Sequence, residues 1–190
     1  MTTDYPFVIR HAVDSSFIAY VESLIETHIH QFKRNQFDPA RRKAWIMRDG
    51  VDPALKEKKL ELVEKFNIRN WVMDPKFYDL IGHISEGGAV HPHTDSELPG
   101  RMHVRMNVLV MKPEGGCVPL LDGIPIDIDL GDAWLCFSSH CEHATTPVEG
   151  PKPRSIISYG LQVERAEAFA LFAKYLAWKN AHCAPAAVRG

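Results

Sequence analysis

The first third of the chain carries its inward-facing residues at the three- and four-residue spacing of amphipathic helices. One such run follows Asp14, a residue type that caps helix N-termini. Its inward positions are Phe17, Val21, Leu24, Ile25, His28 and Phe32. A second run follows Asp52-Pro53, a cap before a proline, and its inward positions are Leu55, Leu60, Val63 and Phe66. Residues 1–70 are therefore expected to form a mainly helical support layer, with a short strand in "KAWIMRDG" between the two helices.

From about Trp71 the spacing changes from helical to alternating, which is the period of half-buried strands. The strand-like runs, separated by Gly, Pro and Asp, are "FYDLIGHI", "MHVRMNVLVM", "IPIDIDL", "AWLCFSS" and "SIISYGLQV". Consecutive strands with short connections predict a mainly β core over residues 71–163, either a cupin-like jelly roll or a barrel. The N-terminal helices are expected to pack on one of its sheets.

A last helix is predicted over residues 164–179, within a C-terminal segment that runs to residue 190. Its apolar positions are Phe169, Leu171, Phe172, Tyr175, Leu176 and Trp178. A helix that is apolar on most sides needs cover on most sides. Two possibilities remain for what buries this apolar surface. One is the sheet together with a partner subunit in a homodimer, and the other is the core of the domain alone. At 190 residues the chain is long enough for a single domain spanning 1–190.

Composition narrows the classes of function. Apolar residues make up 45% of the chain and the formal net charge is −2, so no basic face is expected to bind nucleic acid or an anionic membrane. Residues 1–20 lack the pattern of a secretion signal, and no apolar run approaches the length of a membrane span. The 4 cysteines lack the spacing of a disulfide framework, which favours a reducing, cytoplasmic setting.

The candidate chemistry begins at the stretch "VHPHTD", which places His93 and Asp95 shortly after a strand-like run. His140 and His143 follow a later strand, and Arg154 opens the next one. Two imidazoles and one carboxylate on one face of an iron(II) ion leave three of its positions open. An arginine on an adjacent strand can bind a carboxylate through two parallel hydrogen bonds. The set fits iron(II) and a dicarboxylate cosubstrate, and the spacing to Arg154 favours His143 over His140 as the third ligand.

Strand parity supports a site in this region. In "RMHVRMNVLVM" the residues His103, Arg105 and Asn107 share one face, whereas the opposite face is wholly apolar. The apolar face should pack against the N-terminal helices, and the polar face should line a site rather than a dry core. Arg154 and Ser158 share a face of the last strand, so Ser158 is the preferred hydroxyl to bind a carboxylate beside Arg154.

In order and spacing, "VHPHTD", "RMNVLVMKPEGGC", "FSSHCEH" and the arginine-led last strand resemble the motifs of iron(II)/2-oxoglutarate dioxygenases, and within them the aspartyl/asparaginyl β-hydroxylase-like branch. The resemblance runs from about Tyr78 to Val163. It implies a double-stranded β-helix that uses iron(II), 2-oxoglutarate and O2 to hydroxylate an unactivated carbon, with release of succinate and CO2. His93 and His143 would be the metal-binding histidines, and Arg154 would bind the far carboxylate of 2-oxoglutarate.

The chain departs from that branch at two positions. Arg105 and Asn107 fall where the branch has an Arg-x-His pair that faces the cosubstrate and substrate, so an amide replaces the histidine. Asp95 stands where the branch tends to have glycine. This carboxylate completes the His-Asp-His triad of the wider superfamily, which includes the free proline hydroxylases. It argues against a halogenase, which needs that coordination position for halide, and it weakens the case for a growth-factor-like protein domain as substrate.

The expected substrate is an amino acid, free or within a peptide, or a small biosynthetic intermediate, because the polar strand face can hold a carboxylate or an amide. His91, His103 and His140 are the candidate substrate contacts, although His91 is equally consistent with an exposed loop residue. Nucleic acid and membrane are not expected as partners.

Other interpretations of the same residues stay open. The polar stretch could be a turn without a metal. A structural zinc ion could be held by Cys136, Cys141, His140 and His143, although these lack paired Cys-x2-Cys spacing. A cupin-like metalloenzyme that does not use 2-oxoglutarate would need the metal residues without Arg154. A non-catalytic binding protein on the same fold would need neither.

Overall fold

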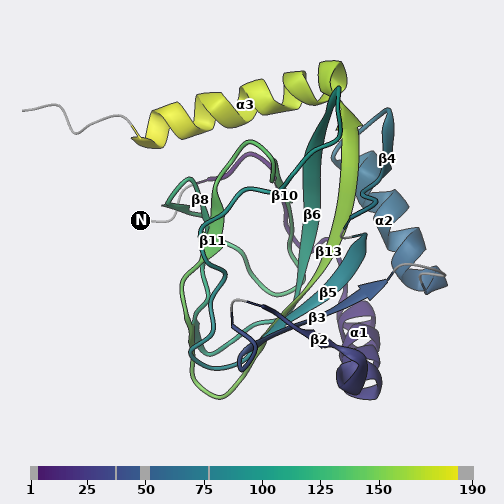
Figure 1. Ribbon diagram of the computed structural model, residues 1–190, viewed down its shortest axis with the longest axis vertical. Coiled ribbons are helices and arrows are strands. Elements are labelled where there is room, and N and C mark those ends of the chain that lie inside the picture. The colour runs from purple at the N-terminus through teal and green to yellow at the C-terminus, as the bar shows by residue number, and fades with distance from the viewer. Residues whose placement is uncertain (1–3, 37, 48–51, 77, 184–190) are drawn as a thin grey trace, which may run out of the picture.

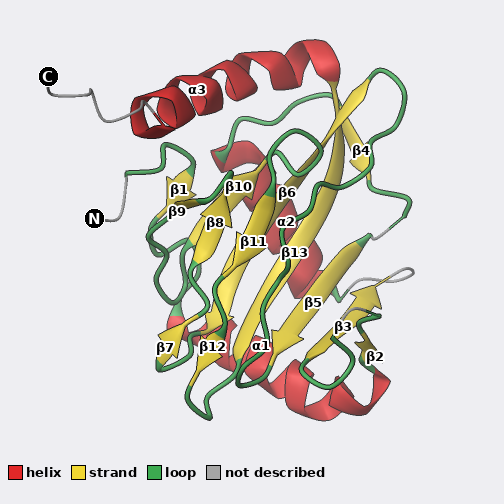
Figure 2. Cartoon of the chain, turned by 60° about the vertical axis from the view of Figure 1, so that its left-hand side comes forward, coloured by secondary structure: helices red, strands yellow, loops and turns green. Residues whose placement is uncertain are grey.

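The computed structural model describes residues 4–36, 38–47, 52–76 and 78–183. Its largest element is an 8-stranded antiparallel sheet, which fills the centre of Figure 2. Across the sheet the order is β1 (Val8–Ile9), β10 (Ala133–Cys136), β6 (Arg101–Met111), β13 (Arg154–Glu164), β5 (Asp79–Ile84), β3 (Arg42–Met47) and β2 (Lys33–Arg34), with β4 (Trp71–Met73) also paired to β13. The long strands β6 and β13 place Ser158 opposite Asn107 and Gly160 opposite Arg105. The polar positions of both strands therefore meet at the centre of the sheet.

A second, smaller layer faces this sheet. It consists of a 3-stranded sheet in the order β11 (His143–Thr145), β8 (Pro119–Leu121), β9 (Ile124–Pro125) and of the pair β12 (Val148–Glu149) and β7 (Gly115–Gly116). In Figure 1, β8 and β11 lie on one side of β6 and β13, and the helices α1 (Ser15–His28) and α2 (Pro53–Lys65) lie on the other. The prediction of a mainly β chain with few helices is confirmed, and its facing antiparallel layers are consistent with a jelly roll.

Both N-terminal helices begin where the sequence predicts. The Asp14 carboxylate accepts a hydrogen bond from the backbone N–H of Phe17 at 2.9 Å, and the Asp52 carboxylate accepts one from Ala54 at 2.9 Å. A short 3₁₀ turn, η1 (Ile29–Gln31), follows α1. The apolar side chains of β6 and the buried side chains of both helices belong to one cluster, which includes Val104, Met106, Val108, Val110, Val21, Ile25, Leu55 and Leu62. The prediction that Leu60 faces inward is wrong, because the buried face of α2 follows the helical spacing of Leu55, Leu62 and Val63 and leaves Leu60 50% exposed. The apolar face of β6 thus helps to form the core, and its polar face is left for the opposite side.

The structure contains several short strands outside the predicted runs, and some predicted runs form shorter strands than expected. The alternation does not predict β1, which joins the edge of the large sheet through β10. The run "IPIDIDL" forms only the two residues of β9, although Ile126 and Ile128 are buried and Asp127 is exposed. Its alternation reflects burial, but the pairing with β8 ends at Ile126, whose N–H donates to the carbonyl of Pro119 at 3.0 Å. The predicted strand in "KAWIMRDG" is β3, and its Asp49-Gly50 end lies outside the described residues.

The last helix, α3 (Arg165–Cys183), lies across one end of the two layers in Figure 1 and runs further than predicted. Tyr175 and Trp178 are buried on its inner side, where the Trp178 ring meets the Tyr5 ring edge to face at 4.8 Å between centroids. Phe169 on its outer side is 61% exposed. The domain therefore covers one side of α3, and cover of the other side by a partner subunit stays a prediction. None of the helices in the described ranges is long and apolar enough to cross a bilayer.

A buried ion pair joins α2 to the large sheet. Lys59 Nζ lies 2.8 and 3.0 Å from the two carboxylate oxygens of Asp79, and both residues are buried. Replacing Lys59 by methionine leaves a buried carboxylate without its cation, so we expect the free energy of unfolding to fall by about 3–5 kcal/mol in urea denaturation. Lys65→Met is the matched control, because Lys65 pairs with Glu61 on the surface and its loss should cost less than about 1 kcal/mol. Equal effects of the two substitutions would contradict a desolvated pair.

Candidate metal centre

Backbone pairing brings the predicted metal ligands together from two separate parts of the chain. His93 and Asp95 lie in the connection between β5 and β6, and His143 is the first residue of β11. His93 and His143 form an isolated antiparallel bridge, in which the N–H of His143 donates to the carbonyl of His93 at 2.9 Å and the reverse bond measures 3.3 Å. The N–H of Asp95 donates to the carbonyl of Ser138 at 2.7 Å. Main-chain hydrogen bonds therefore hold the connection against the neighbouring layer.

The three side chains converge on one point. His93 Nε2 lies 3.8 Å from Asp95 Oδ1, and His143 Nε2 lies 4.0 Å from Asp95 Oδ2. One donor atom from each residue falls within 4.8 Å of the other two. His93 is exposed, whereas Asp95 and His143 are half-buried, so the centre has one open side. The structure thus assembles His143 rather than His140 with Asp95.

The protonation of both imidazoles suits a cation. His93 Nδ1 lies 2.7 Å from the carbonyl oxygen of His91, and His143 Nδ1 lies 3.3 Å from that of Cys141. A carbonyl only accepts hydrogen bonds, so Nδ1 of each ring is the donor, and Nε2 is the nitrogen that faces Asp95 and can offer a lone pair in the neutral tautomer. Burial lowers the pKa of His143 to about 4 despite the opposing effect of Asp95, which keeps that lone pair available near neutral pH. The donor set fits a divalent ion that accepts nitrogen and oxygen ligands.

The Asp95 carboxylate is held in its charged form. Burial alone would raise the pKa of Asp95, but Arg105 and then His143, His103 and His93 together lower it below its ordinary value. Arg105 Nε and His103 Nδ1 each lie 3.5 Å from Asp95 Oδ2. The His103 ring is fully buried, with its Nε2 3.6 Å from Asp74 Oδ2. The predicted polar face of β6 therefore lies directly behind Asp95, the candidate carboxylate ligand.

Arg105 connects this ligand to the rest of the sheet. Its Nη1 donates to Ser158 Oγ at 3.0 Å, and its Nη2 lies 3.6 Å from Asp74 Oδ2. Ser158, which the sequence predicts beside Arg154, is thus hydrogen-bonded to Arg105. The spacing along β13 explains this, because Ser158 lies directly opposite Asn107 on β6, one position along that face from Arg105. Cosubstrate binding by Arg105 and Ser158 stays a prediction.

Arg154 lies in a narrow cavity of about 70 Å³ that reaches the metal centre. Asn107, Trp134 and His143 line the same cavity. The Arg154 side chain is 3% exposed, and its guanidinium carbon lies 5.7 Å from the centre of the Trp134 ring. Among the residues that the structure describes, no carboxylate forms an ion pair with Arg154. Burial lowers the pKa of this guanidinium, but an arginine stays charged in proteins, so the cavity holds an unpaired cation.

The sequence does not identify Trp134 as a residue of the site, because its position in the cavity depends on pairing between strands. It lies opposite Asn107 in the register of β10 with β6. An aromatic residue in the strand before "SSHCEH" is the only signal that the sequence offers for it, and such residues are common in cores.

The remaining predicted contacts lie at the edge of the centre. The side chain of His91 is exposed, and its backbone carbonyl orients His93. His140 Nδ1 lies 2.8 Å from Ser139 Oγ, and its ring packs against Phe172 of α3 at 5.3 Å between centroids. Substrate contacts by His91, His103 and His140 stay predictions.

The residues behind the centre leave no room for a side chain at Gly160. A Cβ atom there would lie 2.7 Å from the carbonyl oxygen of Tyr78 and 2.9 Å from Asp74 Cβ. Gly160→Ala is therefore expected to lower the free energy of unfolding by about 1–3 kcal/mol and to weaken metal binding by displacing Asp74 from Arg105. Chemical denaturation and metal titration measure the two effects. The control is Gly82→Ala, where the nearest atom lies 3.4 Å away in a side chain and both effects should be smaller.

No model of a known protein family matches the sequence, and no curated protein is a significant match to it. Solved structures do match the fold. The viral collagen prolyl hydroxylase vCPH from Paramecium Bursaria Chlorella virus-1, in complex with 2-oxoglutarate, is 13% identical with a TM-score of 0.63 and covers 82% of this chain and 94% of its own.

Two further structures agree. HygX from Streptomyces hygroscopicus, with nickel and 2-oxoglutarate bound, is 13% identical with a TM-score of 0.61, over 83% of this chain and 82% of its own. The non-haem α-ketoglutarate-dependent epimerase SnoN from nogalamycin biosynthesis is 13% identical with a TM-score of 0.62, over 83% of this chain and 76% of its own. At such low identity the likeness concerns the fold alone: this chain has the fold of these oxygenases.

Proposed function

We propose that this protein is an iron(II)- and 2-oxoglutarate-dependent dioxygenase that hydroxylates an unactivated carbon. The observation that carries the proposal is the buried guanidinium of Arg154, which forms an ion pair with no carboxylate of the described residues and lies in a cavity that His143 also lines. A buried cation without a partner is costly, so the site is built for an anionic ligand that reaches toward the metal ligands. A small dicarboxylate meets both requirements, because one carboxylate can pair with Arg154 while the other reaches the metal ligands. The shared fold with 2-oxoglutarate-binding proteins supports this ligand.

In the proposed enzyme His93, Asp95 and His143 hold the iron, because iron(II) accepts mixed nitrogen and oxygen ligands. When bound, iron(II) with 2-oxoglutarate and O2 supplies an oxidant strong enough to remove hydrogen from an unactivated carbon, and the cosubstrate leaves as succinate and CO2.

The chain's own part is binding and orientation. Arg154 binds the far carboxylate of the cosubstrate through two parallel hydrogen bonds. The Asn107 amide lines the same cavity, in which Arg154 and His143 both lie. Arg105 and His103 fix the Asp95 carboxylate from behind, so that it presents the same oxygen throughout. The apolar walls formed by Val90, Leu121 and Ile156 among others exclude water from the cavity.

The proposed substrate is an amino acid, free or in a peptide, or a small biosynthetic intermediate. Solved relatives in fold include a prolyl hydroxylase from Trichoplax adhaerens in complex with a peptide fragment and HygX with hygromycin B bound. Both substrate classes are compatible with a centre that is open on the His93 side. Membership of the aspartyl/asparaginyl β-hydroxylase-like branch is part of the proposal, and so is a cytoplasmic setting, which agrees with the free thiols of all 4 cysteines.

Anaerobic titration tests the proposal. Iron(II) is added first and 2-oxoglutarate second, and a visible charge-transfer band of the chelate is expected. His93→Ala should abolish the band, whereas His91→Ala should keep it, because the His91 side chain is exposed and only its carbonyl takes part. Iron binding without a band would favour a cupin-like metalloenzyme that does not use 2-oxoglutarate. Absence of iron binding would overturn the proposal.

A further inference from the structure

A second group of metal-binding side chains lies beside the proposed iron centre. Cys136 ends β10 and Cys141 lies in the connection to β11, and their sulfur atoms are 3.6 Å apart. A ring nitrogen of His143 lies within 4.8 Å of both sulfur atoms. Both cysteines are buried, at 3% and 0% exposure. Neither thiol has a part in the proposed reaction.

The separation of the two sulfur atoms matches a tetrahedral ion. Zinc–sulfur bonds of about 2.3 Å at the tetrahedral angle place two sulfur ligands roughly 3.7–3.8 Å apart. The backbone holds the pair at this spacing, because the N–H groups of His140 and Cys141 both donate to the carbonyl of Phe137 at 2.9 Å. Little rearrangement of the sulfur atoms is therefore needed to bind such an ion.

The two groups of ligands differ in the ions that they prefer. Thiolates select soft or borderline ions such as Zn²⁺ and Cu⁺, whereas the imidazole and carboxylate set of the first centre suits iron(II). Cys136 and His143 also line the cavity that leads to Arg154, which gives an ion a route to the thiols. The two groups of ligands share His143. Because a neutral imidazole has only one nitrogen lone pair, His143 can bind an ion in only one of the two groups at a time.

We propose that Cys136, Cys141 and His143 form a second metal site, for a thiophilic ion such as Zn²⁺, and that its occupation excludes iron by taking His143. Binding forms two metal–sulfur bonds and one metal–nitrogen bond in place of three water ligands of the ion, and it releases the two thiol protons to solvent with no change of oxidation state. Solvent supplies the fourth ligand. The site itself stands without the proposed dioxygenase activity, and only its inhibitory consequence rests on that activity.

Cobalt(II) is the probe for this site, since cobalt–thiolate bonds give a charge-transfer band in the near ultraviolet. The full-length protein is titrated without oxygen and with a reductant that lacks thiols. The band is expected in the wild type and in Asp95→Ala, where the first centre is broken and the second is intact. In the Asp95→Ala background, where the first centre cannot compete for the ion, a further Cys141→Ser substitution should weaken cobalt binding by on the order of 100-fold and remove the band. Cys117→Ser is the control, because Cys117 is buried in a different apolar cluster.

The outcomes separate clearly. A band that is absent from both the wild type and Asp95→Ala, or one that survives in Cys141→Ser, overturns the proposal. If Cys141→Ser does not fold, as judged by circular dichroism, Cys136→Ser serves in its place, and the band intensity of the wild type must correspond to two thiolate ligands.

Competition completes the test. Wild-type protein loaded with one equivalent of Cu⁺, a soft ion that selects thiolates over carboxylates, should no longer retain iron(II) through desalting, whereas Cys141→Ser treated in the same way should retain it. Retention of iron by the copper-loaded wild type would refute mutual exclusion. A cobalt–thiolate band without any iron–2-oxoglutarate band would leave the second site standing and refute only the dioxygenase proposal.

Discussion

Replacement of Arg154 by methionine is expected to weaken 2-oxoglutarate binding by on the order of 100-fold or more. Two charge-assisted hydrogen bonds contribute about 1.5–3 kcal/mol each, and 1.4 kcal/mol corresponds to a factor of ten in the dissociation constant. Methionine keeps most of the length of the side chain and so preserves packing against the Trp134 ring. Titration of 2-oxoglutarate into the anaerobic iron(II) protein measures the change.

The same substitution is expected to raise stability when 2-oxoglutarate is absent. The Arg154 guanidinium is desolvated without an anionic partner among the described residues, and replacing such a charge by an apolar group should add about 1 kcal/mol or more to the free energy of unfolding. Thermal unfolding with and without 2-oxoglutarate measures this effect. Without the ligand the variant should be the more stable protein, and only the wild type should gain stability when the ligand is added.

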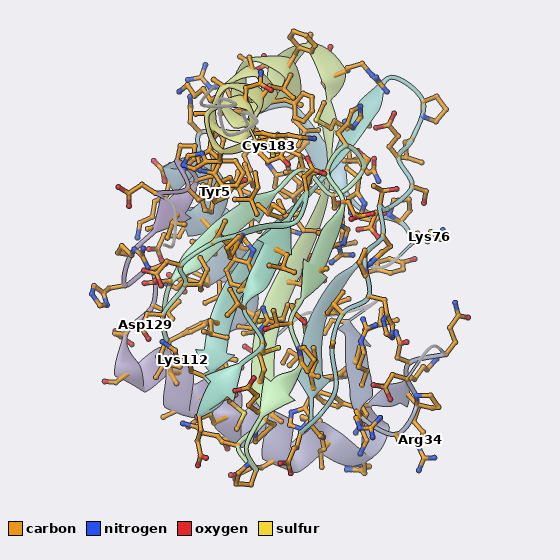
Figure 3. All side chains as sticks on the ribbon, turned by 90° about the vertical axis from the view of Figure 1, so that its left-hand side faces the viewer. Tyr5, Arg34, Lys76, Lys112, Asp129 and Cys183 are labelled. Atoms are coloured by element: carbon orange, nitrogen blue, oxygen red, sulfur yellow. The ribbon has the colours of Figure 1, made fainter. Side chains whose placement is uncertain are left out.

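Arg34→Met is the control for both effects. Arg34 lies on β2 and is exposed, at the far edge of the large sheet in Figure 3. Its replacement should change neither ligand binding nor stability by more than about 0.5 kcal/mol. Unchanged cosubstrate affinity in Arg154→Met would show that the cavity does not bind the far carboxylate.

Asp95→Asn is expected to weaken iron(II) binding by on the order of 100-fold or more. Binding energies of about 10–16 kcal/mol for four-ligand protein sites amount to roughly 3 kcal/mol per ligand, and an amide oxygen replaces little of what a carboxylate contributes. The substitution also removes the anion that faces Arg105 and His103, both 3.5 Å away. Anaerobic calorimetry with iron(II), or with manganese(II) as a redox-stable substitute, gives the affinity.

Glu97→Gln is the matched control for Asp95→Asn. Glu97 lies two residues further along the same connection and pairs with Arg165 and His140 instead of the metal ligands. Its replacement should leave metal affinity nearly unchanged. Equal losses in the two variants would point to a disturbed connection and not to a lost ligand.

The order of the candidate ligands and of Arg154 along the chain, and the strand parity of the residues around them, are both visible in the sequence, whereas their roles in binding stay predictions. Parity assigns a face, and the polar face of β6 with His103, Arg105 and Asn107 does lie on the site side. Parity does not assign a partner. Ser158 shares the face of Arg154 yet hydrogen-bonds to Arg105, because the offset between β13 and β6 decides which side chains meet.

The groups that the sequence did not reveal depend on pairing between distant strands. The register of β10 with β6 places Trp134 beside Asn107 and Cys136 beside Arg105. The sequence groups Cys136 and Cys141 only within a possible four-ligand zinc site, and the turn between them is what places their sulfur atoms 3.6 Å apart. The two-residue strand β1 is too short for any alternation to be seen. Such contacts are decided by tertiary packing and not by local pattern.

The main-chain bridge between His93 and His143 has a kinetic consequence. The two imidazoles are carried by residues that are hydrogen-bonded to each other, at the exposed rim where the two layers meet. Breaking these two bonds separates the ligands while the buried strands β6 and β13 stay paired. In the proposed enzyme we therefore expect metal exchange to proceed through a local opening that does not require global unfolding. The rate of this opening would set the lifetime of the bound ion, so that the ion leaves and returns while the core of the sheet stays folded.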